Sequence, residues 1–142
     1  MVTPFDSELY NESVVLRDLL LRKPLNLKFN EKDREQDKLD THIIGYLPSN
    51  PKKVISVCIL MDKGSNIYRL RQVAVATEFQ KKGYGTKMIK FAEKTAKTMG
   101  AVEIVAHTRE YAKSFYSKLG YDLGTEIFQS VGIPHVRGSK KL

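Results

Sequence analysis

The stretch Glu78-Phe79-Gln80-Lys81-Lys82-Gly83-Tyr84-Gly85-Thr86-Lys87-Met88 (residues 78–88) separates two different kinds of sequence. The residues before it, IYRLRQVAVA (67–76), predict a strand. The residues after it, KMIKFAEKTAKTMG (87–100), have helical apolar spacing and end at a glycine that can cap a helix. A glycine-rich, basic turn at the start of a helix is suited to an anion, because free backbone N–H groups and the helix dipole meet there.

Two common phosphate-binding motifs do not fit this turn. A P-loop has four residues between its glycines, whereas one residue separates Gly83 from Gly85. A dinucleotide-binding fingerprint requires a third glycine at position 88, where the chain has Met88.

The remaining sequence predicts a mixed α/β or α+β fold. The N-terminal segment around 8–24 has helical spacing and stops at Pro24, and the charged segment 25–40 is expected to be a loop with one helical turn at most. Strands are expected at 41–47, 54–61 and 67–76, as an antiparallel meander of three. After the helix at 85–100 we expect a strand at 102–107, a helix at 110–120, a strand at 121–128 and a last strand from 133.

Length and composition bound the class of protein. With 142 residues, of which 42% are hydrophobic, we expect one domain over residues 1–142 with a proper core. No apolar run can span a membrane and no secretory signal is evident, so we expect a cytoplasmic protein in which the single cysteine, Cys58, is a core residue. The net charge of +8 favours an anionic partner, although scattered surface lysines explain much of it.

Two motifs in the expected order resemble the GNAT-type N-acetyltransferase superfamily. Residues 80–85, Gln-Lys-Lys-Gly-Tyr-Gly, resemble its Q/R-x-x-G-x-G/A signature, and residues 112–121 resemble its A-x-x-F-Y-x-x-x-G-[FY] segment. The tail Val131 to His135, together with Asp37 and His42, resembles a bacterial subgroup of small, mostly uncharacterised members. The resemblance covers nearly the whole chain.

The resemblance implies a mostly antiparallel sheet flanked by helices, in which two parallel strands, Ile67 to Val75 and Val102 to Ala106, splay apart to hold acetyl-CoA. Backbone groups of Val73 and Val75 would pair with the pantetheine, and N–H groups of Lys82 to Thr86 would hold the pyrophosphate. The cofactor-binding residues implied in this way are Val73, Ala74, Val75, Gln80, Lys81, Lys82, Gly83, Tyr84, Gly85, Thr86, Ala112 and Phe115.

For catalysis, the resemblance places Tyr116 at the position of the general acid that protonates the leaving thiolate. The general base stays open among the histidines and Glu78; we favour His107, at the end of the strand beside the expected thioester. His42, Arg71 and His135 are the expected substrate contacts. Ser130 stands where the subgroup commonly has an acid, a difference that bears on the acceptor.

The sequence therefore predicts an acetyl-CoA-dependent N-acetyltransferase for a small amine such as an amino sugar, a polyamine or an amino acid. A protein acetyltransferase, a non-catalytic acetyl-CoA-binding domain and a nucleic-acid binder on the same fold stay open as alternatives. We expect no metal, because no ligand cluster is evident, no membrane partner, nucleic acid only in the last alternative, and possible homodimer formation.

Overall fold

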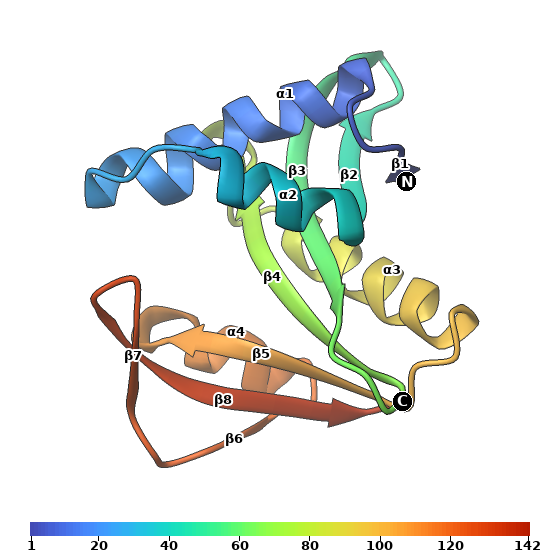
Figure 1. Cartoon of the computed structure of the whole chain (residues 1–142). Coiled ribbons are helices and arrows are strands. Elements are labelled where there is room, and N and C mark those ends of the chain that lie inside the picture. Colours follow the sequence, from blue (N-terminus) through green and yellow to red (C-terminus); the bar gives the residue numbers. More distant parts are fainter.

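An eight-stranded mixed sheet runs through the computed structural model (Figure 1), whose side chains are described for residues 1–50 and 53–142. The strands follow the order β1-β2-β3-β4-β5-β8-β6, and β7 also pairs with β8. All neighbouring strands are antiparallel except β4 and β5, as expected. The strands are β1 (Val2–Thr3), β2 (Thr41–Leu47), β3 (Asn50–Asp62), β4 (Ile67–Val75), β5 (Glu103–Arg109), β6 (Asp122–Leu123), β7 (Phe128–Ser130) and β8 (Ile133–Lys141).

The parallel pair is the feature that creates space for a site. Strands β4 and β5 pair only from Ile67 opposite Glu103 to Leu70 opposite Ala106, and then diverge (Figure 1). Beyond this point β4 pairs with β3 alone and β5 with β8 alone. The predicted splay of two parallel strands is therefore confirmed.

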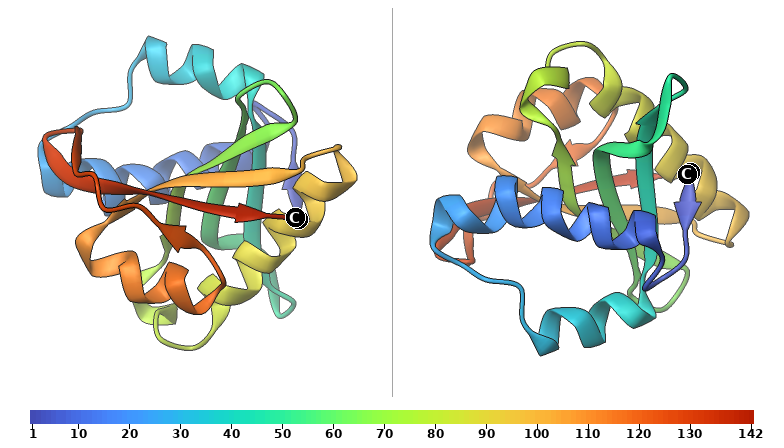
Figure 2. Two further views of the ribbon diagram at one scale, coloured as in Figure 1. Left: turned by 90° about the horizontal axis from the view of Figure 1, so that it is seen from below. Right: turned by 90° about the horizontal axis from the view of Figure 1, so that it is seen from above.

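Helices cover both faces of the sheet. Helix α1 and helix α3 pack on opposite faces of β2, β3 and β4, and α4 packs on β5 and β6 (Figure 2). The helical segments are α1 (Glu8–Arg17), the π-helical turn η1 (Asp18–Arg22), η2 (Lys23–Leu25), α2 (Glu31–Leu39), η3 (Thr77–Phe79), α3 (Tyr84–Thr98), η4 (Glu110–Ala112) and α4 (Lys113–Lys118).

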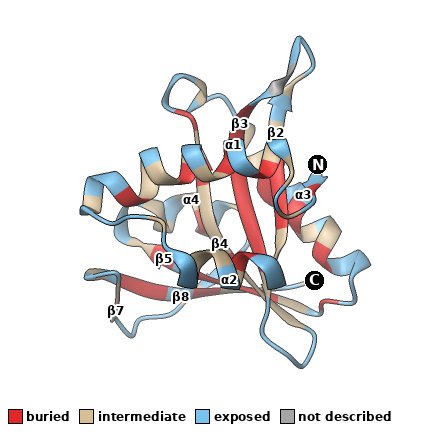
Figure 3. Cartoon of the chain, turned by 45° about the horizontal axis from the view of Figure 1, so that its top comes forward, coloured by how far each residue is buried: buried red, intermediate tan, exposed pale blue. Residues whose placement is uncertain are grey.

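Helix α3 forms because its apolar positions recur on one face and glycines stand at both ends. The buried residues of α3 are Met88, Ile89, Ala92 and Ala96, and they pack in one core cluster with residues of the strands, whose buried parts are red in Figure 3. Gly83 precedes the helix with φ +85°, and Gly100 follows it with φ +93°. Left-handed conformations of this kind are accessible to glycine without a steric penalty.

The expectation of a loop over residues 25–40 is wrong, because residues 31–39 form helix α2. This helix is nearly all charged, and only Asp37 is buried, so it lacks the apolar period by which a helix is recognised in sequence. What defines its start is a capping box, in which Asn30 and Asp33 each bind the other's backbone N–H group.

The single strand expected at 121–128 is also wrong. Leu123 of β6 pairs with Gly138, and Phe128 of β7 pairs with His135. The two paired positions are therefore five residues apart in the segment from β6 to β7 but only three residues apart in β8. The two extra residues cannot fit the ladder, and the segment between β6 and β7 loops out. At the N-terminus, β1 is a strand of two residues that pairs with β2.

Candidate active site

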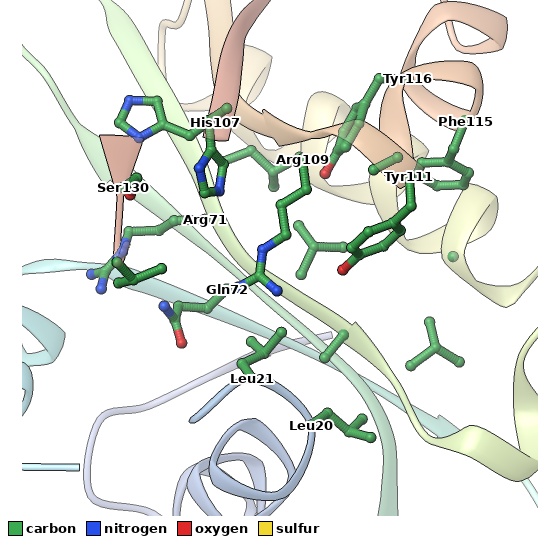
Figure 4. A pocket seen from close by; sticks show the side chains of 18 of the residues that line it. Leu20, Leu21, Arg71, Gln72, His107, Arg109, Tyr111, Phe115, Tyr116 and Ser130 are labelled. Atoms are coloured by element: carbon green, nitrogen blue, oxygen red, sulfur yellow. The ribbon is translucent and has the colours of Figure 1, made fainter. Parts of the chain in front are cut away.

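A cavity of about 920 Å³ opens where β4 and β5 diverge (Figure 4). Its lining divides into two parts. We call the first part the glycine half: it comprises the end of β4 from Val73, the loop to α3, and the η4–α4 segment. We call the second part the arginine half: it comprises residues of η1, Leu27, α2, β4 up to Arg71, the end of β5 and the β7–β8 turn.

In the glycine half, no described strand pairs with the edge of β4 that faces β5. Ala74 and Val75 pair with Val57 and Ser56 of β3, while β5 has already turned away. Their backbone on the other edge can therefore accept an extended ligand as an added strand. The expected pantetheine has this shape.

The start of α3 supplies an anion site next to this edge. No side chain caps the helix, and its first turn carries no acidic residue. Its first N–H groups are thus available to an anion, and the 15-residue length of the helix supports the dipole. Gln80 Nε2 donates to the carbonyl oxygen of Val75 at 2.9 Å, which ties the loop back to β4.

The structure brings most of the expected cofactor residues together. Those that line the cavity are Val73, Ala74, Val75, Gln80, Lys81, Gly83, Gly85, Thr86, Ala112 and Phe115. Lys82 and Tyr84 do not line it; their side chains lie against the ring of Phe79, with the Lys82 Nζ 5.9 Å from its centroid. Only their backbone N–H groups remain candidates for the anion.

Tyr116 lies at the junction of the two halves. Its ring is 6% exposed and packs edge-on against Phe115 and Tyr121, with centroids 5.2 and 5.3 Å away. The hydroxyl points into the cavity (Figure 4) and makes no hydrogen bond to any residue that the structure describes. Burial raises the pKa of Tyr116 well above its usual value, so the phenol keeps its proton at neutral pH.

His107 also lines the cavity, on β5. Partial burial, and then the positive charge of Arg69 and the neighbouring His135, lower the pKa of His107 to about 4. The imidazole of His107 is therefore neutral at pH 7.

Of the expected substrate contacts, two reach the cavity and one does not. His135 lines it, and its Nδ1 donates a hydrogen bond to the carbonyl oxygen of Ile133 at 2.7 Å. Arg71 lines it while Nη1 binds Asp40 Oδ2 at 2.8 Å. His42 is buried instead beneath α1, edge-on to Tyr10, with Nε2 2.8 Å from the carbonyl oxygen of Asp37. Ser130 lines the cavity.

The sequence did not single out Gln72, which stands at the junction. Residues Arg71 to Ala74 of β4 face only Val57 to Ile59 of β3, and Gln72 takes φ +54° in the resulting bulge. Its side-chain oxygen accepts a long hydrogen bond from Arg17 Nε, at 3.5 Å. Nothing in the local sequence signals a bulge at a glutamine.

Arg17 belongs to a buried polar cluster that holds α1 and α2 together. Arg17 and Asp37 are both 0% exposed and form two hydrogen bonds, of 2.9 and 3.2 Å, while Tyr10 donates to the same carboxylate at 2.6 Å. Burial alone would raise the pKa of Asp37, but hydrogen bonds from Arg17 and Tyr10 reverse this and lower it. The cluster therefore fixes the helices above the bulge.

Arg69, Arg109 and Tyr111 were likewise not predicted, although all three line the cavity. A helical or strand pattern does not reveal which exposed cations converge, and only the divergence of β4 and β5 brings these together. Within the described parts, residues 1–50 and 53–142, no group of His, Cys, Asp and Glu side chains could hold a metal ion, and no helix is long and apolar enough to cross a membrane.

With the divergent strands and the uncapped helix start established, comparison with known proteins places the chain. A family model described as "Acetyltransferase (GNAT) family" matches residues 9–121. The chain belongs to the GNAT acetyltransferase family, and the fold predicted from its two motifs is confirmed.

Individual relatives agree with this assignment. A Bacillus subtilis protein named "putative acetyltransferase" is 30% identical over 113 residues, 75% of this chain and 74% of the relative. The structure of a Lactobacillus plantarum protein, "putative N-acetyltransferase", superposes with a TM-score of 0.85 at 20% identity, over 100% of this chain and 97% of that one. An aminoglycoside 6'-N-acetyltransferase complexed with coenzyme A has a TM-score of 0.79 at 15% identity, over 99% and 96%. At such identities the structures share the fold alone.

Proposed function

We propose that the protein is an acetyl-CoA-dependent N-acetyltransferase that acetylates the primary amine of a small molecule by direct attack. The observation that carries this proposal is the cavity itself: a β4 edge without a partner strand and an uncapped helix start lead to the hydroxyl of Tyr116, which forms no hydrogen bond among the described residues. Residues 1–142 would form one acetyltransferase domain. A cytoplasmic location and a homodimer stay predictions from the sequence.

The residues of the glycine half fit the expected acetyl donor. Val73 to Val75 would bind its pantetheine through the free strand edge, and the N–H groups at Gly83 to Thr86 would bind its pyrophosphate. Charge-assisted hydrogen bonds contribute roughly 1.5–3 kcal/mol each, so a few of them would support micromolar affinity, which requires about 8 kcal/mol. The bound donor supplies an acetyl group as a thioester whose leaving group is a thiolate.

Tyr116 would donate its proton to the leaving sulfur. Its raised pKa keeps the phenol protonated at neutral pH, so that its proton is available when the thiolate leaves. His107 is neutral at pH 7 and would accept a proton from the attacking amine, directly or through water. Its lowered pKa makes it a weak base, unless a bound anion offsets the positive charge of Arg69.

The test joins binding and turnover. Acetyl-CoA at a hundred times its dissociation constant should stabilise the protein by about 2.7 kcal/mol in thermal unfolding, and random duplex DNA should not. Release of free CoA from a panel of amines can be followed with a thiol reagent, because Cys58 is fully buried and burial raises its pKa to about 12. Absence of any shift with acetyl-CoA would contradict the proposal, and a shift without turnover on any amine would reduce it to acetyl-CoA binding.

A further inference from the structure

We propose that the acceptor is an amine that also carries an anionic group, a carboxylate or a phosphate, bound in the arginine half by Arg109 and Arg69. The inference rests on the proposed function, because the arginine half is the acceptor side only if the glycine half holds acetyl-CoA. It narrows the expected acceptors, among which amino sugars and polyamines carry no anion.

The charge of the arginine half is the first observation. Four cationic side chains line it, and Asp33 is its single carboxylate among the described residues; the cations are Lys32, Arg69, Arg71 and Arg109. Asp33 is engaged in the capping box of α2 and lies 3.9 Å from Arg22 Nε. The surface that meets the acceptor is thus strongly positive.

The second observation is that two of these cations have no carboxylate partner among the described residues. Asp40, whose side chain is 1% exposed, binds Arg71 from behind the cavity wall. Neither Arg69 nor Arg109 forms an ion pair within the described residues, and the Nε of Arg69 is buried without a hydrogen-bond partner. A buried, unpaired donor is destabilising, and an anion within reach would satisfy it.

The placement of Arg109 fits this role. It ends β5, opposite His135, and its guanidinium extends into the cavity between Gln72 and Tyr111 (Figure 4). The planar guanidinium can bind a carboxylate or phosphate with two parallel hydrogen bonds. Because Arg109 stands at the junction with the glycine half, an anion bound there would hold the acceptor close to Tyr116.

The same charges disfavour a polycation. An aminoglycoside, the acceptor in the name of one structural neighbour, carries several amines that are protonated at pH 7. Like charges in a partly desolvated cavity repel, since the effective dielectric there is far below that of water. The wall formed by Leu20, Leu21 and Leu27 offers apolar surface instead, so an acceptor with an anion and an apolar part matches the lining best.

The experiment compares amines that differ only in the anion. Suitable pairs are L-leucine with L-leucinamide, 2-aminoethyl phosphate with ethanolamine, and glucosamine 6-phosphate with glucosamine, with spermidine and kanamycin as polycations. The amine of leucinamide is less basic than that of leucine, so protonation favours the amide, and a preference for leucine must come from its carboxylate. We expect kcat/KM to be about 10- to 100-fold higher for the anionic member of at least one pair, the effect of one charge-assisted hydrogen bond. Which pair responds distinguishes a carboxylate site from a phosphate site.

Arg109→Gln should abolish that preference, mainly through KM for the anionic amine, and leave the neutral member within about twofold. Arg109→Lys, which keeps the charge but loses the paired hydrogen bonds, should be intermediate. Arg34→Gln is the matched control: it removes the same charge from the surface, where Arg34 binds Asp6, and should change neither rate.

The outcomes separate this inference from the proposed function. Turnover that is equal for both members of every pair, or highest for spermidine or kanamycin, would overturn the inference and leave the acetyltransferase assignment intact. If acetyl-CoA binds and no amine is acetylated, the proposed function fails, and the anion site is judged by calorimetric titration of the CoA complex with L-leucine and 2-aminoethyl phosphate. Binding that Arg109→Gln removes would support the anion site; no binding of either would refute it.

Discussion

Replacing Tyr116 by phenylalanine removes one oxygen from the cavity and leaves the ring in place. The hydroxyl has no hydrogen-bond partner among the described residues, so no protein contact is lost, and the ring keeps its packing against Phe115 and Tyr121. We therefore expect the free energy of unfolding to change by no more than about 0.5 kcal/mol. Affinity for acetyl-CoA should also hold, because the expected binding groups lie on β4 and at the start of α3.

Turnover is where Tyr116→Phe should act. Loss of a general acid lowers rates by roughly 10²-fold at the lower end of the known range, which is about 2.7 kcal/mol in the activation barrier. The measurement is kcat at saturating acetyl-CoA, followed by release of CoA, with an amine that the wild type acetylates. Because burial raises the pKa of Tyr116, deprotonation of this phenol should cause no loss of wild-type activity at any pH up to 10, the ordinary pKa of tyrosine.

Tyr111→Phe is the matched control, since Tyr111 also lines the cavity but is 78% exposed. It should keep kcat within about twofold, the size of effect expected from a surface change. Equal kcat for Tyr116→Phe and the wild type at all pH values would show that Tyr116 only packs, and that water or another group protonates the thiolate.

Three further predictions concern binding, stability and titration. Gly83→Ala should weaken acetyl-CoA binding by at least tenfold, whereas Gly100→Ala should not. Both glycines have φ near +90° and open space for a Cβ, so the backbone strain of about 1–3 kcal/mol is common to both variants and cancels in the comparison. Equal affinities of the two variants by calorimetry would refute the anion site at the helix start. Asp37→Asn should lower the free energy of unfolding by about 3–5 kcal/mol in urea titration, because it leaves Arg17 buried and uncompensated; a loss below 1 kcal/mol would contradict the burial of this pair. NMR titration should place the pKa of His107 well below 6.5, and the signal is assigned by its absence from the spectrum of His107→Gln. Because the unfolded chain binds more protons than the folded chain, this histidine destabilises the fold as pH falls from 6.5 toward 4. A pKa of 6.5 or above would contradict the prediction.

The glycine half could be predicted from sequence because its function depends on local features. Gly83 and Gly85 lie at a strand-to-helix junction, and a helix start needs no distant residue to present its N–H groups. The segment with Tyr116 follows the next strand, and the parallel pairing of β4 with β5 brings the two motifs to one cavity. Short-range pattern and chain order together were sufficient there.

Helix α2 could not be predicted by the same means. Its stability comes from a capping box and from one buried ion pair with α1, between Asp37 and Arg17, which are 20 residues apart in the chain. A period of apolar residues, the main sequence signal of a helix, is absent because Asp37 is the one buried residue of this helix. Asp37 also explains the position of His42, because its carbonyl oxygen binds the Nε2 of His42, which is buried under α1 and does not reach the cavity.

The arginine half depends on tertiary geometry throughout, and this explains why the acceptor was left open by the sequence. Arg69 and Arg71 are two residues apart on β4 and therefore share a face, but Arg109 joins them only because β5 diverges at its end. The bulge at Gln72 changes the register of β4 between the arginines and Val73, so the strand presents cations on one side of the bulge and a free backbone edge on the other. A one-residue change in register moves every following side chain to the opposite face, so a single residue separates the proposed donor and acceptor sites on this strand. If the proposed function holds, we expect selectivity for the acceptor to change through Arg69 and Arg109 while the binding of the acetyl donor stays as it is.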